Sequence, residues 1–442
     1  MREESKMHHH SRVLDVFAML LAGIVAIHPV KAMAKPDNIL WGVNESGLEF
    51  GKGPIAGTNF SIPDPSYYLS RGVRLIRTPF QIIRLQPVPN EPLAPNMVEY
   101  LKTIIAQDSA AGAITVLDPH AYGFYPIAGQ SQDILKNHMA QQDYLGLMQR
   151  IAATFAHDNV AISLMNEPHT GADSDYAPVW NKAIAVIRAQ GFSGVIIVPH
   201  SHWSTASDIT PDKPFIGTIV DPDNNWVLEL HLYLDPDNSG TYRQQVVSPT
   251  IGVERLTGAI AWSRQSKIRL FLGETGVPPS PAGLAAFQQL LQNIATAPDV
   301  FWGVAIWGGG AWWKPDYSMR LDPLYGVDRP QFTLFEYMIT PGLLYFVRDA
   351  GGAAPDVRIQ LDGTDIGRPV RITALRTGVP QVVPVRSGLS AGPHQIRILL
   401  AGPSGSGPVY LVNSTWKGVP DSDHSYGIVT SVGYEFNLTI PH

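Results

Sequence analysis

Two glutamates of this sequence each stand at the end of an apolar run. Glu167 lies in SLMNEPHTG, directly after the β-branched run VAISL, and Glu274 ends the run IRLFLGE. Such runs are typical of strands buried on both faces, and Pro168 cannot continue a central strand because it has no backbone N–H. Two carboxylates that face each other across a site can serve as proton donor and nucleophile, the pair that glycosidic cleavage requires.

Other apolar runs of the sequence also end in residues that can do chemistry. Each of these residues, and each of the two glutamates, has a structural explanation when it is considered alone. A glutamate can form a salt bridge in a loop, an arginine can form an ion pair at the edge of the core, and a histidine can be hydrogen-bonded within the core. Several of them at the ends of such runs favour one common site. The set comprises Asn44, Arg77, His120, Asn166, His200, His231, Tyr233 and Trp307.

The types of these residues suit a pair of working carboxylates. A nucleophilic carboxylate must stay ionised, so a fixed cation such as Arg77 and a hydroxyl such as Tyr233 would be suitable partners for it. The other carboxylate must instead bring a proton to the leaving oxygen. Asn166 can donate to a sugar 2-hydroxyl, and Trp307 can offer an apolar face to the ring.

The apolar runs that position these residues recur along most of the chain. Eight strand-like runs begin at residues 39, 73, 113, 160, 194, 226, 268 and 301. Most intervals contain a stretch with apolar residues at three- and four-residue spacing, such as 143–156 and 282–296, which predicts helices. The alternation predicts an α/β fold, a (β/α)8 TIM barrel over residues 35–347, whose strand ends carry the chemistry. An open doubly wound sheet is the alternative, but no glycine-rich phosphate-binding turn supports it.

The N-terminus predicts export. Residues 1–34 have a charged start, an apolar run at 16–27 and the small-residue pattern Ala32-Met33-Ala34, which together are typical of a cleaved signal peptide. A membrane anchor is the alternative, but it needs about 20 apolar residues. The chain has no cysteine, which suits an exported bacterial protein with a large core better than a small disulfide-bonded one. We expect a periplasmic or secreted protein.

Charge and metal-ligand spacing exclude several partners. The predicted leader carries four basic and three acidic residues, so its removal changes the net charge from −6 to −7. Binding to nucleic acid or to an anionic membrane is therefore not expected. The motif His200-Ser201-His202 could bind a metal, but no third ligand stands at a suitable spacing. No metal and no cofactor are expected.

Seven segments resemble, in their order and approximate spacing, glycoside hydrolase family 5, and most of all its endo-β-1,4-glucanase (cellulase) branch. The segments are GVNESGLEFG, RTPFQIIRLQP, LDPHAYG, MNEPH, HLYLDPDNSGT, FLGETG and IWGGGAWW, and the resemblance covers about residues 38–325. The resemblance implies retaining hydrolysis of internal β-1,4 bonds of cellulose or related β-glucans. It also implies that Glu167 is the acid/base and Glu274 the nucleophile.

The same resemblance implies further roles and a polysaccharide as the partner of a monomeric enzyme. The supporting residues would be Arg77, His120, Asn166, His231 and Tyr233, and the substrate-binding residues Trp307, Trp203, Trp312, Trp313 and Asn44. The segment HAYGF departs from related cellulases, because Ala121 and Phe124 replace polar residues at one end of the cleft. Since fold and catalytic pair do not set the substrate, a β-mannanase, a xyloglucanase or a lichenase remains an alternative. A non-catalytic glycan-binding protein is the alternative of another class, and the presence of both glutamates speaks against it.

The pattern of the sequence changes after residue 347. The segment RDAGGAAPD at 348–356 predicts a linker, and short apolar runs with Gly/Pro turns over 357–442 predict a small β-sandwich. The segments SAGPHQIRILL and VYLVNSTWKG weakly resemble calcium-dependent xylan-binding modules. The stretch that would bind calcium, AGPSGSGP, has no carboxylate. This unit is therefore expected either to bind glycan without calcium or only to cover the barrel.

Overall fold

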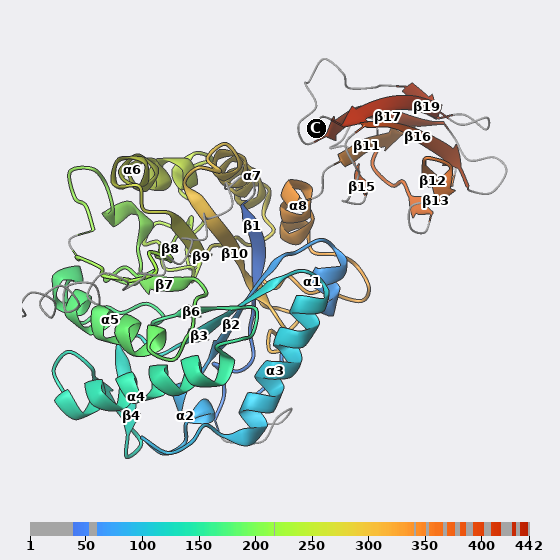
Figure 1. Cartoon of the computed structure of the whole chain (residues 1–442). Helices are drawn as coiled ribbons and strands as arrows, with labels where there is room; N and C mark the ends of the chain where they lie inside the picture. Colours follow the sequence, from blue (N-terminus) through green and yellow to red (C-terminus); the bar gives the residue numbers. More distant parts are fainter. Residues whose placement is uncertain are drawn as a thin grey trace, which may run out of the picture. The chain divides into compact units, whose positions relative to one another are not determined.

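The structure of the protein is a computed structural model (Figure 1), and it describes residues 39–52, 60–215, 217–339, 342–350, 353–365, 369–375, 381–385, 392–401, 408–416, 427–429 and 434–440. The signal peptide predicted over residues 1–34 lies outside these ranges, as does most of the stretch AGPSGSGP. Within the same ranges, no helix combines the length and the apolar character that crossing a membrane requires.

Eight parallel strands close into a barrel, so the predicted (β/α)8 fold is confirmed (Figure 1). Around the barrel they follow one another in chain order, and the last strand pairs with the first. The strands are β1 (Leu40–Glu45), β2 (Leu75–Phe80), β3 (Ile114–Pro119), β6 (Val160–Ser163), β7 (Ile196–Pro199), β8 (Trp226–His231), β9 (Leu270–Glu274) and β10 (Phe301–Gly309). Each begins within two residues of its predicted start.

Helices alternate with these strands. They are α1 (Ser66–Ser70), α2 (Ile82–Leu85), α3 (Pro95–Ala110), α4 (His138–Phe155), α5 (Asp173–Arg188), α6 (Ile251–Ser266), α7 (Pro281–Ala295) and α8 (Pro330–Ile339). Local chemistry explains two of the starts: the side chain of Asn137 accepts from first-turn N–H groups of α4, and Ser280 does the same for α7. A hairpin of β4 (Phe124–Ile127) and β5 (Gln130–Asp133) follows β3. Between β7 and β8 the described residues form only a 3₁₀ turn (Ala206–Asp208).

The interior of the barrel changes from apolar to polar along the strands. An apolar cluster inside it includes Leu75, Val116, Ala161, Val227 and Phe271 from five strands. Side chains alternate along a strand, so the residue two positions later points to the same interior. On the same five strands these residues are Arg77, Asp118, Ser163, Glu229 and Gly273. The four that carry side chains are fully buried and form a polar layer below the strand ends.

The C-terminal unit consists of antiparallel sheets with a core of its own, as predicted. One sheet has the order β15-β11-β17-β18, and the other has the order β13-β12-β16-β19, with β14 paired to β12. The strands are β11 (Gly342–Arg348), β12 (Asp356–Leu361), β13 (Thr364–Asp365), β14 (Val370–Arg371), β15 (Gln381–Val385), β16 (Gly392–Leu400), β17 (Val409–Trp416), β18 (Gly427–Val429) and β19 (Tyr434–Ile440).

One predicted domain boundary needs correction. Residues 342–347 were expected to belong to the barrel, and the linker was expected to begin at residue 348. Strand β11 instead pairs with β17 along its whole length and with β15 over residues 342–346, so its residues belong to the C-terminal sheet. The apolar run GLLYFV reads equally well as the end of one unit or the start of the next, because only its pairing partners decide between them.

Candidate active site

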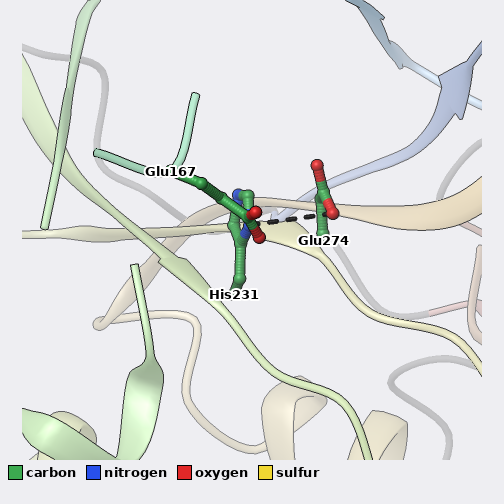
Figure 2. A group of neighbouring side chains, drawn as sticks. All are labelled: Glu167, His231 and Glu274. Atoms are coloured by element: carbon green, nitrogen blue, oxygen red, sulfur yellow. Dashed lines mark hydrogen bonds and ion pairs between the residues drawn. The ribbon is translucent and has the colours of Figure 1, made fainter. Parts of the chain in front are cut away.

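The two glutamates lie next to each other at the C-terminal ends of the barrel strands. Glu274 is the last residue of β9, and Glu167 follows β6. Oxygen atoms of the two carboxylates and a nitrogen of His231 all lie within 4.8 Å of one another (Figure 2). Glu167 has a φ of 42°, a strained conformation of the kind found where the surrounding structure holds a functional side chain. Its side chain is 19% exposed, and that of Glu274 is 7% exposed.

Glu274 is held through both of its oxygens. Arg77 Nη1 donates to Oε1 at 3.0 Å, and the hydroxyl of Tyr233 donates to Oε2 at 2.9 Å. Hydrogen bonds to an ionised carboxylate are stronger than neutral ones, and they favour its charged form. The two contacts fix the orientation of the carboxylate and place two hydrogen-bond donors on it, which suits a nucleophile.

Arg77 is the centre of a fully buried network. Its guanidinium contacts the carboxylates of Asp118 at 3.1 Å and Glu229 at 3.1 Å, besides that of Glu274. It also donates to the amide oxygens of Asn44 at 2.9 Å and Asn166 at 2.7 Å. Burial alone would lower the pKa of Arg77, but the surrounding carboxylates raise it above its ordinary value. Arg77 is therefore a permanent cation beneath the site.

His231 connects the two glutamates. Its Nδ1 lies 2.8 Å from Glu167 Oε1 and 3.7 Å from Glu274 Oε2, and its Nε2 lies 3.3 Å from Glu229 Oε1. Burial would lower the pKa of His231, but the three carboxylates raise it to about 10. Because both ring nitrogens face carboxylate oxygens, the imidazole is a cation that donates on both sides.

His120 and Trp307 complete the wall beside Asn166. His120 Nδ1 lies 2.9 Å from Asp118 Oδ2, and its Nε2 lies 3.3 Å from the amide nitrogen of Asn166. The ring of Trp307 stacks on that of His120 with centroids 6.2 Å apart, and its indole N–H donates to Tyr317 at 3.1 Å. These contacts fix the amide of Asn166 beside the acid/base candidate.

A cavity of about 610 Å³ opens on the side of Glu167. Its lining includes Glu167, His231 and Tyr233 together with Trp203 and the loop residues 236–239. Trp203 is 44% exposed, and His169 stacks on its ring with centroids 4.6 Å apart and an angle of 5° between the planes. An indole held in this way is an apolar platform at the edge of the site.

Three predicted substrate-binding residues have other partners. Asn44 is fully buried, donates to the carbonyls of Gly273 and Ala305 and accepts from Arg77, so it supports the arginine and does not face the cavity. Trp313 stacks on Tyr317 at 3.9 Å, and Trp312 stacks on Phe50 at 5.5 Å.

Sequence reasoning did not single out Asp118 and Glu229. Both are buried inside the barrel, where they pair with Arg77 and with a histidine each. The available signal was a charged residue two positions before a candidate histidine in an apolar run, in LDPH and LELH. Since side chains alternate along a strand, each carboxylate shares the face of its histidine.

Among the described residues, Glu167, His231 and Glu274 are also the group with enough spatial proximity to hold a metal ion. A metal ligand must offer a free lone pair, so a coordinating histidine is neutral. Both nitrogens of His231 face carboxylates and its pKa is about 10. In this group His231 therefore acts as a cation that lies between the carboxyl groups of Glu167 and Glu274.

Comparisons with known proteins identify similar chains. Residues 66–306 match the sequence model of the cellulases of glycosyl hydrolase family 5. A probable endo-β-1,4-glucanase B of Neosartorya fischeri is 32% identical over 325 residues, which are 70% of this chain and 94% of the relative. A crystal structure of an endo-β-1,4-glucanase of Xanthomonas axonopodis pv. citri superposes with a TM-score of 0.64 at 31% identity, covering 68% of this chain and 99% of that one. The endoglucanase Cel5A of Pseudomonas stutzeri, in complex with cellobiose, superposes with a TM-score of 0.61 at 30% identity, covering 68% of this chain and 92% of that one.

Proposed function

The chain belongs to the cellulases of glycosyl hydrolase family 5, and from this premise we propose that it hydrolyses internal β-1,4-glucosidic bonds of cellulose or a related β-glucan with retention of configuration. The observation that carries the proposal is the short separation of Glu167 and Glu274, since a carboxylate oxygen of one lies within 4.8 Å of a carboxylate oxygen of the other. Retaining enzymes have carboxyl groups about 5 to 5.5 Å apart, whereas inverting enzymes leave about 6.5 to 9.5 Å for a water.

In the first step Glu274 attacks the anomeric carbon while Glu167 gives its proton to the glycosidic oxygen. The bond between that carbon and the leaving oxygen breaks, and a covalent ester forms on Glu274. Arg77 and Tyr233 hold Glu274 in position for this attack. Asn166, whose amide oxygen is fixed by Arg77 at 2.7 Å, keeps its NH₂ group for the 2-hydroxyl of the sugar.

In the second step Glu167, now ionised, takes a proton from a water that attacks the same carbon. The ester bond to Glu274 breaks and the carboxylate returns. His231 lies 2.8 Å from Glu167 and 3.7 Å from Glu274, so its positive charge stabilises whichever glutamate is ionised. The two displacements restore the original β configuration.

The stereochemistry of the first product tests this mechanism. An NMR time course on a cello-oligosaccharide should show the β-anomer first and the α-anomer only after slow mutarotation. Initial release of the α-anomer would make Glu274 a base and contradict the retaining mechanism. The preferred polymer follows from product profiles on soluble cellulose, mannan, xylan and mixed-linkage glucan, for which we expect the highest rate on soluble cellulose.

For the two ends of the chain the proposals come from the sequence. We propose that residues 1–34 direct export and are removed, which N-terminal sequencing of the mature protein tests. We also propose that the C-terminal unit binds glycan, as its weak resemblance to xylan-binding modules indicates. Affinity electrophoresis of a Glu167→Gln variant in xylan and cellulose gels, with cello-oligosaccharide blocking the barrel site, should show retardation that persists. Complete loss of retardation would leave the barrel as the binding unit.

A further inference from the structure

Glu229 is a buried carboxylate that touches no reacting atom of the proposed mechanism. It lies in the polar layer of the barrel, two residues before His231 on β8, and its side chain is 0% exposed. Placing a charge in a protein interior is costly unless cations and hydrogen-bond donors compensate it. The partners of Glu229 therefore indicate what the charge does there.

One oxygen of Glu229 contacts two cations. Oε1 lies 3.1 Å from Arg77 Nε and 3.3 Å from His231 Nε2, while Oε2 accepts from the hydroxyl of Ser163 at 3.1 Å. Arg77 holds the nucleophile candidate, and His231 holds the acid/base candidate. The two halves of the catalytic pair thus share one anchor below the site.

The neighbouring strand leaves room for this carboxylate. Gly273 on β9 faces Glu229, and a Cβ atom at that position would lie 2.1 Å from Oε1 and 2.9 Å from the carboxyl carbon. The backbone of Gly273 is not in the left-handed region, so the glycine is required by space. The residue before Glu274 is therefore small because Glu229 occupies the space that its side chain would need.

Glu229 takes no part in the transfer of charge between the other two carboxylates. During the first step negative charge leaves Glu274 as the ester forms, and it appears on Glu167 as the proton departs. His231 faces both of these carboxylates. A cation that serves both needs a third, unchanging carboxylate to keep it charged, and Glu229 faces its other nitrogen.

We infer that Glu229 is a positioning residue that fixes Arg77 and His231 together and keeps His231 a cation while charge moves from Glu274 to Glu167. The inference deepens the proposed function and rests on the roles assigned there to the two glutamates. The charged groups around His231 are Glu167 after β6, Glu274 on β9, Glu229 on β8 and, beyond direct contact, Arg77 on β2 and Asp118 on β3.

Two substitutions of Glu229 distinguish the effect of its charge from the effect of its side-chain length. Glu229→Gln keeps the size and removes the charge, so His231 should lose its proton more easily. We expect kcat to fall about 10- to 100-fold, KM to change less than about 3-fold, and the basic limb of the kcat/KM profile to move to lower pH. Glu229→Asp keeps the charge but shortens the side chain, so kcat should fall while the basic limb stays in place.

A matched control is Asp173→Asn, because Asp173 is also a buried carboxylate that pairs with a histidine, His200, at 2.9 Å. It should lower the melting temperature without moving the basic limb. If Glu229→Gln does not fold, Ser163→Ala frees Oε2 and leaves every charge in place; a drop in kcat of about 3- to 10-fold is then expected. Unchanged kcat in the Ser163 variant would contradict the inference.

A readout without substrate keeps this inference apart from the proposed function. In ¹⁵N NMR titrations of the imidazole groups, His231 should lose its charge at a lower pH in Glu229→Gln than in the unsubstituted protein. An unchanged titration, or a wild-type pH profile with only a lower melting temperature, would reduce Glu229 to a packing role. If the unsubstituted protein cleaved no β-1,4-glucan, the proposed function would fail while the titration still decided the electrostatic role of Glu229.

Discussion

The hydroxyl of Tyr233 donates a 2.9 Å hydrogen bond to Oε2 of Glu274, and Arg77 holds the other oxygen of the same carboxylate. Tyr233→Phe removes this donor and keeps the ring in its buried position. Hydrogen bonds to charged groups contribute about 1.5 to 3 kcal/mol, which corresponds to about 10- to 100-fold in rate. We expect kcat/KM on soluble cellulose to fall by that factor with the fold intact.

Tyr125→Phe is the matched control for this substitution. Tyr125 is also buried and donates at 2.8 Å, but its acceptor is the amide oxygen of Gln86, outside the catalytic network. The control should lower stability and leave kcat/KM within about 3-fold. Equal losses of activity in both variants would show that the hydrogen bond to Glu274 has no special role.

The roles of Glu167 and Glu274 can be separated by the product that an external nucleophile forms. Gln at either position should lower kcat by about 10³-fold or more, because each group acts in the transition state. With Glu167→Ala and an activated aryl cellobioside, azide should attack the covalent intermediate and give a β-glycosyl azide. With Glu274→Ala, azide should replace the nucleophile directly and give the α-glycosyl azide.

NMR of the two azide products checks this assignment, and circular dichroism checks that the variants are folded. The reversed pattern, with the α product from the Glu167 variant, would exchange the two roles. Near-native turnover on a glucan by either Gln variant would remove the residue from the mechanism.

The sequence predicted the barrel and most of the network because both depend on local patterns. Apolar runs mark strands buried on both faces, and the residue that ends each run must lie at one end of the barrel. This pattern singles out His120, Asn166, His231, Tyr233 and both glutamates as candidates. Arg77 is different, because it lies within β2, in the buried polar layer below the strand ends. Helix 282–296 was likewise visible from its spacing, and the structure has α7 at Pro281–Ala295.

The remaining features depend on contacts between distant segments. Asn44 ends a strand like the other candidates, but only the packing of β1 against β2 and β10 turns its amide toward Arg77 and the backbone. Glu229 reads as one polar residue in an apolar run until Arg77, Ser163 and Gly273 are seen around it. In the sequence, Trp203, Trp312 and Trp313 are equally good candidates for substrate binding. Their stacking partners, which are His169, Phe50 and Tyr317, distinguish them.

Trp203 should bind the part of the glucan substrate that lies on the leaving-group side of the cleft. It lines the cavity that opens beside Glu167, and His169 covers one face of its ring. Stacking contributes about 0.5 to 1.5 kcal/mol. We therefore expect Trp203→Ala to raise KM for cellopentaose about 3- to 10-fold, with a smaller effect on an aryl cellobioside whose leaving group ends near Glu167.

Trp312→Ala serves as the control for Trp203, since Trp312 stacks on Phe50 and does not line this cavity. Its effect should not depend on the length of the leaving group. If Trp203→Ala changed KM equally for the long and the short substrate, Trp203 would not lie on the leaving-group side.

Glu49 should make the stability of the barrel depend on pH. It lies in the loop after β1 with 6% exposure, and its Oε2 accepts from the N–H of Gly47 at 2.7 Å. Burial raises the pKa of Glu49 to about 7, against the smaller opposing effect of His120. In the unfolded chain a glutamate titrates near pH 4.3, so the folded-state pKa is the higher one.

The sign of the pH effect follows from this difference. Below about pH 4 the carboxyl is neutral in both the folded and the unfolded state, so it does not change the free energy of unfolding. Between about pH 4 and 7 the unfolded state ionises first, so the free energy of unfolding falls. Above about pH 7 both states are ionised and the loss of stability is constant. Glu49→Gln removes the titration, while its amide oxygen can still accept from Gly47. We expect equal melting temperatures of variant and parent at pH 4 and a variant that is more stable by ~1–3 kcal/mol at pH 8.

The exposed Glu99→Gln on α3 is the control and should show the same small difference at both pH values. A gain for the Glu49 variant that is as large at pH 4 as at pH 8 would mean that it comes from packing, and that the buried carboxyl does not ionise at a cost.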